Sequence, residues 1–290
     1  MDEIARIRRF NRTVTRRLGV LEEHFLGRRR SIGASRVLFE IGSSGIDIRD
    51  LRIRLGLDSG YASRLLRSLE AETLIRIDRS KDDERVRFVR LTGAGLEELA
   101  ALNRLSDEAA SSILDQLSEK QRSLMTEAMD TVERLMRAAS VRIVLEEPSS
   151  RRARECIALY FRDLSERFEA GFDPAVSLSA TEKELTPPDG YLVLADLFGE
   201  AVGCGALKCH SAFGEIKRMW VAPSMRSLGL SRKILGYLED LARQRGLPLL
   251  RLETNKALVE AQGLYRSSGY REVAPFNSEP YAHHWFEKNL

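Results

Sequence analysis

The chain has 290 residues, of which 43% are hydrophobic and 31% charged, and its formal net charge is +3. This length predicts two domains, and the composition is that of a soluble globular chain rather than a disordered or fibrous one. The sequence shows neither an apolar run of the ~20 residues that span a bilayer nor the apolar core of a secretory signal. The three cysteines (Cys156, Cys204 and Cys209) lack metal-ligand spacing, which predicts a cytoplasmic protein without a metal site.

Basic residues are concentrated near the N-terminus. Residues 1–36 carry ten Lys/Arg against four Asp/Glu, and residues 49–92 carry eleven against eight. This distribution indicates a nucleic-acid partner for the first half. Apolar residues at helical spacing predict a long first helix along Ile4, Ile7, Phe10, Val14, Leu18, Leu21 and Phe25.

Further helices are predicted over residues 35–41, 48–55 and 60–74. The last two are joined by a tight turn, and Asp58 or Ser59 is a suitable N-cap for the second of them. Apolar residues at i, i+3, i+4 and i+7 form its buried face. The outer face then carries the DNA-binding candidates Ser59, Gly60, Ser63, Arg64 and Arg67. This is helix-turn-helix geometry, in which the second helix enters the major groove; the alternative is a solvated helix face.

Residues 75–78 and 85–91 alternate as two strands around a charged tip and predict a β-hairpin. Its basic residues are suited to phosphates or to a minor groove, although an exposed hairpin tip is the alternative. These candidates are Arg79, Lys81, Arg85 and Arg87. Two long helices are predicted to follow, over residues 93–117 and 119–139.

This order of elements resembles the MarR family of winged helix-turn-helix regulators. The D-x-R wing signature reads Asp83-Glu84-Arg85, and the L-T-x-x-G continuation reads Leu91-Thr92-Gly93-Ala94-Gly95. The resemblance covers about residues 1–139. It implies an operator on double-stranded DNA, a homodimer formed by the first and last helices, and an aspartate that positions the wing arginine.

The second half is predicted to begin with a strand at residues 141–145, so we expect domains at 1–140 and 141–290. Helices over residues 151–170 and a hairpin of strands 191–197 and 201–208 follow. Residues 215–235 then read as strand, short turn with Gly229, and helix. The first amides of such a helix lack intrahelical partners and lie at its positive end, which suits a phosphate.

This segment resembles motif A of the GNAT superfamily of N-acetyltransferases, R/Q-x-x-G-x-G/A. It reads Arg226-Ser227-Leu228-Gly229-Leu230-Ser231 and departs from the motif at Ser231. Strand 249–254, a helix containing Tyr265, the pair Gly269-Tyr270 and a final strand at 281–288 extend the resemblance over about residues 141–290. The implied fold is α/β (α+β) with a mixed, mostly antiparallel sheet. The alternative to motif A is that residues 215–235 form an ordinary strand-turn-helix connection.

The resemblance implies acetyl-CoA as cosubstrate, held between two strands that splay apart. The Met219 amide would face the oxyanion, Val221 would pair with pantetheine, and the amides of Arg226 to Ser231 would hold the pyrophosphate. Asn255 would bond to the cofactor or close the bend after its strand. On the acceptor side the candidates are Arg167, Phe168 and Phe172, for which ordinary helix packing is the alternative.

Strand alternation predicts that Glu215 shares a face with Lys217, Met219 and Val221, which favours Glu215 as the general base. A strand-end glutamate paired with Lys217 or with solvent is the alternative. Tyr265 is the candidate general acid for the leaving thiolate, and a packed helix tyrosine is the alternative.

We therefore expect a bifunctional transcriptional regulator and acetyl-CoA-dependent N-acetyltransferase, acting on a small amine or amino-acid-like acceptor. A regulator whose second domain only senses acyl-CoA or a metabolite is the competing hypothesis, and acetylation of protein lysines is a third.

Overall fold

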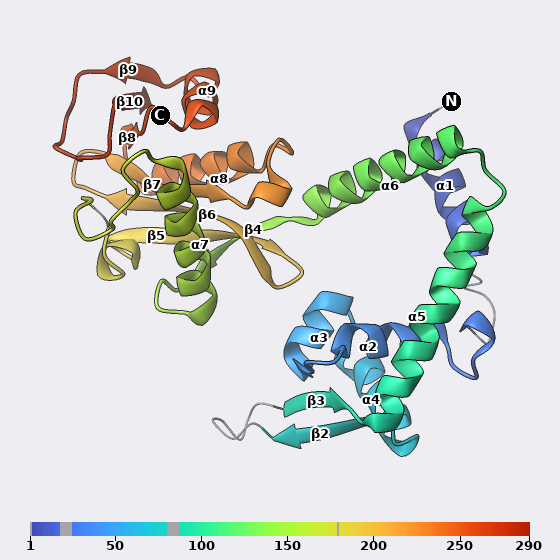
Figure 1. Cartoon of the computed structure of the whole chain (residues 1–290). Coiled ribbons are helices and arrows are strands. Elements are labelled where there is room, and N and C mark those ends of the chain that lie inside the picture. The colour runs from blue at the N-terminus through green and yellow to red at the C-terminus, as the bar shows by residue number, and fades with distance from the viewer. Residues whose placement is uncertain (1, 18–24, 80–86, 179) are drawn as a thin grey trace. The chain divides into compact units, whose positions relative to one another are not determined.

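The computed structural model describes residues 2–17, 25–79, 87–178 and 180–290. For Arg79 it describes the backbone and not the side chain. The chain divides into two compact units, Met1–Glu127 and Ala128–Leu290 (Figure 1). The expected fold class is confirmed: the first unit is a mainly helical winged helix-turn-helix, and the second is an α/β unit with a mixed sheet. Helix α6 (Glu119–Ser140) runs across the division, so the domain limits 1–140 and 141–290 stay a prediction.

The first unit consists of helices around a small sheet with strand order β1-β3-β2. Its elements are α1 (Glu3–Arg17), α2 (Ile32–Ile41), β1 (Ile46–Asp47), α3 (Ile48–Leu55), α4 (Ser59–Ala71), β2 (Ile75–Arg79), β3 (Arg87–Leu91) and α5 (Gly93–Leu114), followed by α6. The predicted hairpin is therefore present, and its tip lies outside the described residues. The apolar residues Ile4, Ile7 and Phe10 of α1 are exposed in the single chain.

The helix-turn-helix forms where the capping residues and the apolar pattern predict it. Helix α3 ends at Gly56, whose φ of 63° is left-handed, and the Asp58 carboxylate caps α4 by accepting from the Tyr61 amide at 2.9 Å. The apolar face of α4 is buried at Ala62, Leu65, Leu66 and Leu69. This packing leaves the opposite face of α4 in solvent.

The start of α5 explains why a glycine is required in the Leu91–Gly95 segment. Thr92 caps the helix by accepting from the Gly95 amide at 3.1 Å, and its hydroxyl donates to the Thr73 carbonyl at 2.6 Å. The first turn of α5 therefore packs directly against the backbone of Thr73 and Leu74, which leads into the wing. A Cβ on Gly95 would lie 2.0 Å from the Leu74 carbonyl oxygen, which is a backbone atom and cannot turn aside.

We predict that Gly95→Ala destabilises the first unit by about 3 kcal/mol, because overpacking against backbone forces α5 to shift. In calorimetry the unfolding transition of that unit should move down by about 10 °C. Gly93→Ala is the matched control, since a Cβ there meets nothing within 4 Å. Equal melting of the two variants would contradict the close approach of Gly95 to Leu74.

The second unit is built on one seven-stranded sheet with the order β4-β5-β6-β7-β8-β10-β9. Neighbouring strands are antiparallel except β7 and β8, which are parallel. The elements are β4 (Arg142–Glu146), α7 (Arg151–Arg167), β5 (Gly190–Leu197), β6 (Glu200–Cys209), β7 (Gly214–Val221), α8 (Leu230–Gln244), β8 (Leu249–Thr254), α9 (Val259–Ser267), β9 (Arg271–Val273) and β10 (His284–Asn289).

Helices α7 and α8 cover opposite faces of this sheet (Figure 1). Val193 and Ala195 of β5 pack in the larger core with α8, whereas Leu192 and Leu194 face the clusters that contain Ala153 and Cys156 of α7. Because both faces are covered, the central strands are apolar on both sides. The predicted helix over residues 151–170 ends earlier, at Arg167, where Phe168 takes an extended conformation.

Candidate active site

The parallel strands β7 and β8 separate soon after they meet. They pair only at Gly214 with Leu250 and at Glu215 with Arg251. Beyond that point β7 pairs only with β6, and β8 only with β10. The inner edges of the two strands therefore present backbone N–H and C=O groups that have no strand partner in the described part of the chain.

Two cavities open along this split. One, of about 110 Å³, lies between α7, β7, β8 and the segment near Tyr281. The other, of about 420 Å³, lies between α7, α9 and the loop after β7. We call them the acceptor cavity and the cofactor cavity, after the roles expected from the sequence. Met219 and Tyr265 line both, together with Tyr160, Leu164, Leu258 and Ala261.

A bulge in β7 overturns the predicted alternation of side chains. Lys217 lies opposite Ala206 and Trp220 opposite Cys204, so two residues of β7 face one residue of β6. The bulge includes Arg218, whose φ of 54° is left-handed.

The prediction that Glu215 shares a face with Lys217, Met219 and Val221 is therefore wrong beyond Lys217. Met219 and Val221 lie on the α8 side of the sheet. The Lys217 ammonium contacts Glu215 on the other side. An inserted residue moves every later side chain of the strand to the opposite face.

The loop after β7 has the backbone form of an anion site. Ser227 and Gly229 both have left-handed φ, of 63° and 78°, and α8 begins at Leu230 without a side-chain cap. No backbone carbonyl in the described ranges accepts from the amides of residues 227–232. These amides lie at the positive end of α8, and Ser227, Gly229, Leu230 and Ser231 line the cofactor cavity.

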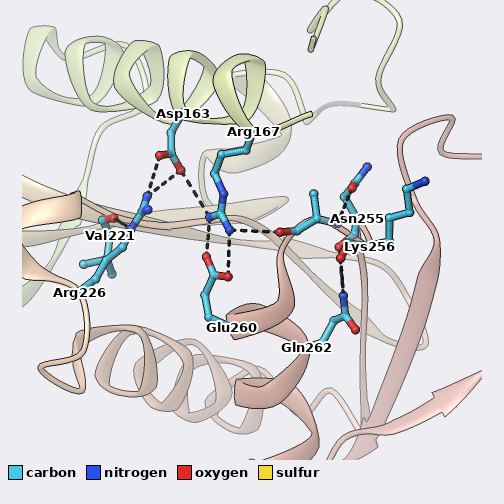
Figure 2. A network of polar contacts seen from close by, with 9 residues as sticks. Asp163, Arg167, Val221, Arg226, Asn255, Lys256, Glu260 and Gln262 are labelled. Carbon is cyan, nitrogen blue, oxygen red and sulfur yellow. Dashed lines mark hydrogen bonds and ion pairs between the residues drawn. The ribbon is translucent and has the colours of Figure 1, made fainter. Parts of the chain in front are cut away.

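Ion pairs join this loop to α7, and α7 in turn to α9 (Figure 2). The Arg226 guanidinium donates to the Val221 carbonyl at 3.1 Å and to both Asp163 carboxylate oxygens at 2.7 Å. The Arg167 guanidinium binds the Glu260 carboxylate and donates to the Ala257 carbonyl at 3.2 Å. This hydrogen bonding with Glu260 raises the pKa of Arg167 and lowers the pKa of Glu260. Asp163, a residue that the sequence did not single out, thus positions the loop.

The three acceptor-side candidates separate in the structure. Arg167 lines the cofactor cavity and is held by Glu260. Phe168 and Phe172 line the acceptor cavity with their ring centroids 6.0 Å apart, and the tilted Tyr281 ring has its centroid 4.9 Å from that of Phe172. With Phe161 they make one wall of this cavity aromatic.

Asn255 closes the bend after β8. Its Nδ2 donates to the Tyr281 carbonyl at 2.7 Å, and its Oδ1 accepts from the Ala257 amide at 2.8 Å. It lines the acceptor cavity rather than the cofactor cavity. Of the two roles considered for Asn255, the geometry favours the structural one.

Glu253 is the acidic group that sequence reasoning missed. It lines the acceptor cavity from β8 and contacts the Lys217 ammonium, which also lies 3.1 Å from Glu215. Glu215 itself lines neither cavity and lies 3.2 Å from the His210 ring. Burial raises the pKa of Glu253, and Lys217 offsets this only in part. Burial alone would lower the pKa of Lys217, but Glu253 and Glu215 together raise it.

Tyr265 reaches the junction of the two cavities from α9. Its side chain is buried, with the ring packed near Tyr270 and Phe286. Burial raises the pKa of Tyr265, so the phenol stays protonated. Its hydroxyl has no hydrogen-bond partner among the residues that the structure describes. A proton donor at the junction is thus available to a group in either cavity.

The DNA-binding candidates of the first unit lie mostly on one exposed face. Ser59, Gly60, Ser63, Arg64 and Arg67 are exposed on α4, and Arg87 is exposed at the start of β3. Of Arg79 only the backbone is described, and Lys81 and Arg85 lie outside the described residues, as does the Asp83 of the wing signature.

Residues 153–270 match the model of the acetyltransferase (GNAT) family. The second unit carries a GNAT acetyltransferase domain. An IAA acetyltransferase from Azospirillum brasilense is 38% identical over 94 residues, which are 32% of this chain and 61% of that protein. The chain therefore spans about three fifths of the length of this curated relative.

Solved structures resemble parts of the chain. A GNAT-family acetyltransferase from Staphylococcus aureus Mu50 is similar with a TM-score of 0.46 and 19% identity, over 52% of this chain and 99% of that one. A MarR mutant from Escherichia coli is similar with a TM-score of 0.37 and 18% identity, over 46% of this chain and 96% of that one. Within the described ranges, no cluster of three metal-ligating side chains and no helix long and apolar enough to cross a bilayer is found.

Proposed function

We propose that the chain is an acetyl-CoA-dependent N-acetyltransferase acting on a small amine or amino-acid-like acceptor. The observation that carries this proposal is the split between β7 and β8. It has an anion loop at one end, the buried side chain of Glu253 in the acceptor cavity, and Tyr265 where the two cavities meet. The GNAT match over residues 153–270 supports the reaction class.

The cofactor cavity fits the donor. The amides of Ser227 to Ser231 would hold the pyrophosphate, whereas the Arg226 amide of the expected set already donates to the Pro223 carbonyl at 3.3 Å. The inner edge of β7 at Val221, whose carbonyl accepts from Arg226, would pair with the pantetheine arm. The Met219 amide, just after the bulge, would face the developing oxyanion. Bound acetyl-CoA supplies an activated acetyl thioester. Asp163 and Arg226 position the loop that receives its phosphates.

The residues around the acceptor cavity divide the proton transfers. Glu253 would take the proton of the incoming ammonium group, and Tyr265 would give a proton to the leaving thiolate. We favour Glu253 over Glu215 as the base because only Glu253 lines the cavity. The aromatic wall of Phe161, Phe168 and Phe172 would contact the apolar part of the acceptor.

The test is release of CoA thiol from acetyl-CoA with a panel of amines and amino acids, next to a known acetyltransferase as positive control. Turnover with one acceptor class supports the proposal. Tight acetyl-CoA binding without turnover on any amine would overturn it and favour the competing function, a sensor of acyl-CoA.

We also propose that the first unit binds an operator on double-stranded DNA as a homodimer, so that the whole chain is a cytoplasmic regulator. The exposed basic face of α4 supports DNA binding, and the exposed Ile4, Ile7 and Phe10 on α1 offer a surface for a second copy. Sedimentation of the Phe10→Glu variant as a monomer would support the dimer surface.

For DNA, we predict that replacing Arg64 and Arg67 together by Ala lowers affinity by about tenfold or more, since each specific arginine contact is worth about 1–3 kcal/mol. Affinity would be measured by fluorescence anisotropy on the operator upstream of the gene at several salt concentrations. Arg104→Ala on α5 is the control, because Arg104 is exposed and pairs with Glu108 on the same helix. Equal loss in both variants would mean a general charge effect and not a recognition helix.

A further inference from the structure

A chain of four titratable side chains connects the acceptor cavity with the protein surface. It begins at Glu253, which lines the cavity, and continues through the buried Lys217 and Glu215. It ends at His210, whose ring nitrogen Nε2 lies 3.2 Å from Glu215. The His210 side chain is 33% exposed, whereas those of Lys217, Glu215 and Glu253 are at most 11% exposed. Each neighbour in the chain is thus within contact distance of the next, and only the last reaches solvent.

The charge of this chain shows why protons would be shared along it. With both carboxylates ionised, Lys217 charged and His210 neutral, the group holds a net single negative charge in a buried setting. A proton on Glu253 or a proton on His210 neutralises it equally. Moving a proton from the cavity end to the surface end therefore costs no net buried charge, which is the expensive quantity.

The flanking charged groups are already paired. Lys208 lies opposite Glu215 in the β6–β7 register, and its ammonium binds Glu184 at 2.7 Å. On the other side Phe213 stacks on the His210 ring at 4.4 Å. The Arg251 guanidinium lies 5.0 Å from the Phe213 ring.

Arg251 in turn pairs with Glu287 at 3.5 Å. Neither neighbouring cation therefore replaces Lys217 as the link between the two carboxylates.

We propose that this chain is the proton outlet of the transferase, an inference that rests on the proposed function. At neutral pH an amine acceptor arrives as an ammonium ion and leaves as an amide, while the thioester leaves as a thiol. One proton per turnover must therefore reach bulk water. Glu253 takes it from the ammonium group, so that the neutral amine nitrogen attacks the thioester carbon. As the carbon–sulfur bond breaks, Tyr265 gives its proton to the thiolate. The second proton that the nitrogen loses restores the Tyr265 phenol, so only the proton on Glu253 has to leave.

The outlet then resets the base. Lys217 gives one proton to Glu215 as it takes one from Glu253, and it stays an ammonium throughout. Glu215 passes the proton to Nε2 of His210, and the ring releases a proton to solvent from its other nitrogen. Glu215 and His210 are thus positioning and relay residues that do not touch the acceptor.

The test uses the full-length protein in a weakly buffered solution. His210→Gln is expected to lower kcat about tenfold, and added imidazole should restore it, because a small proton acceptor can reach Glu215 from solvent. Glu215→Gln breaks the chain inside the protein, so it should lose as much and gain nothing from imidazole. His284→Gln, whose ring pairs with Glu272 away from both cavities, is the control and should match the native enzyme. A His210→Gln loss that imidazole does not restore, or no loss at all, overturns the outlet.

A second measurement does not depend on turnover. By NMR, the His210 ring should titrate at lower pH in Glu253→Gln than in the native chain, because a negative charge of the shared group has been removed. Identical titration curves would overturn the outlet even in an active enzyme. If the native chain turned over no amine, the proposed function would fail, and the titration alone would decide whether the four groups share protons.

Discussion

The Glu253→Gln variant should lose about a thousandfold in kcat, the middle of the about 10²–10⁴ range for a general base. The carboxamide keeps the size of the side chain but cannot take a proton from the acceptor. Because Glu253 lines the acceptor cavity and not the cofactor cavity, the Kd for acetyl-CoA should change less than about twofold. The measurements are kcat, which should fall, and the Kd for acetyl-CoA, which should stay near the native value.

The assignment of Glu253 as the base also predicts the direction in which activity changes with pH. Burial raises the pKa of Glu253, so the ionised base is lost as the pH falls through a value above that of an ordinary glutamate. The acid limb of kcat/KM should therefore lie above pH 4.5. Glu272→Gln, at an exposed ion pair, is the control and should keep native kinetics. A Glu253→Gln variant with more than a tenth of native kcat would return the base role to Glu215.

The second large effect is expected for Tyr265→Phe, with kcat lower by about a hundredfold. In the proposed mechanism the phenol donates a proton at the junction of the two cavities, and its removal would leave the thiolate to depart unprotonated. Burial raises the pKa of Tyr265, so no alkaline loss of activity from this group is expected below about pH 10. Steady-state kinetics and calorimetric acetyl-CoA binding measure the two quantities separately.

Tyr237→Phe on α8 is the matched control, because Tyr237 packs against the core and lines neither cavity. It should keep native kcat and a similar melting temperature. If Tyr265→Phe lost acetyl-CoA affinity in proportion to kcat, the hydroxyl would be part of donor binding and not the acid.

Much of the fold was predictable because it is written in local patterns. The apolar spacing of α4 and α8, the Asp58 cap and the glycine of the loop each act within one or two turns of chain. The connection from β7 through a short turn to α8 is likewise set by residues close together in the sequence. Local signals of this kind place elements and caps before any long-range contact is known.

The remaining features depend on contacts between distant segments. The bulge at Arg218 is defined by the pairing of β7 with β6. The sequence of β7 alone is compatible with a strand that has the bulge and with one that lacks it. Glu253 lies 36 residues after Lys217 and reads as one polar position of an ordinary strand. Likewise Asp163 precedes Arg226 by 63 residues, and no local pattern links them.

The split sheet also bears on how this domain can change by mutation. If the donor arm is held by the inner edges of β7 and β8, its partners are main-chain atoms, and no side-chain substitution removes them. The aromatic wall of the other cavity consists of side chains and has no such protection. A lineage could therefore exchange Phe161, Phe168 or Phe172 and acquire new acceptors while the donor stayed the same. Under the proposed function, donor use would therefore tolerate mutation better than acceptor choice, which would be the trait open to selection.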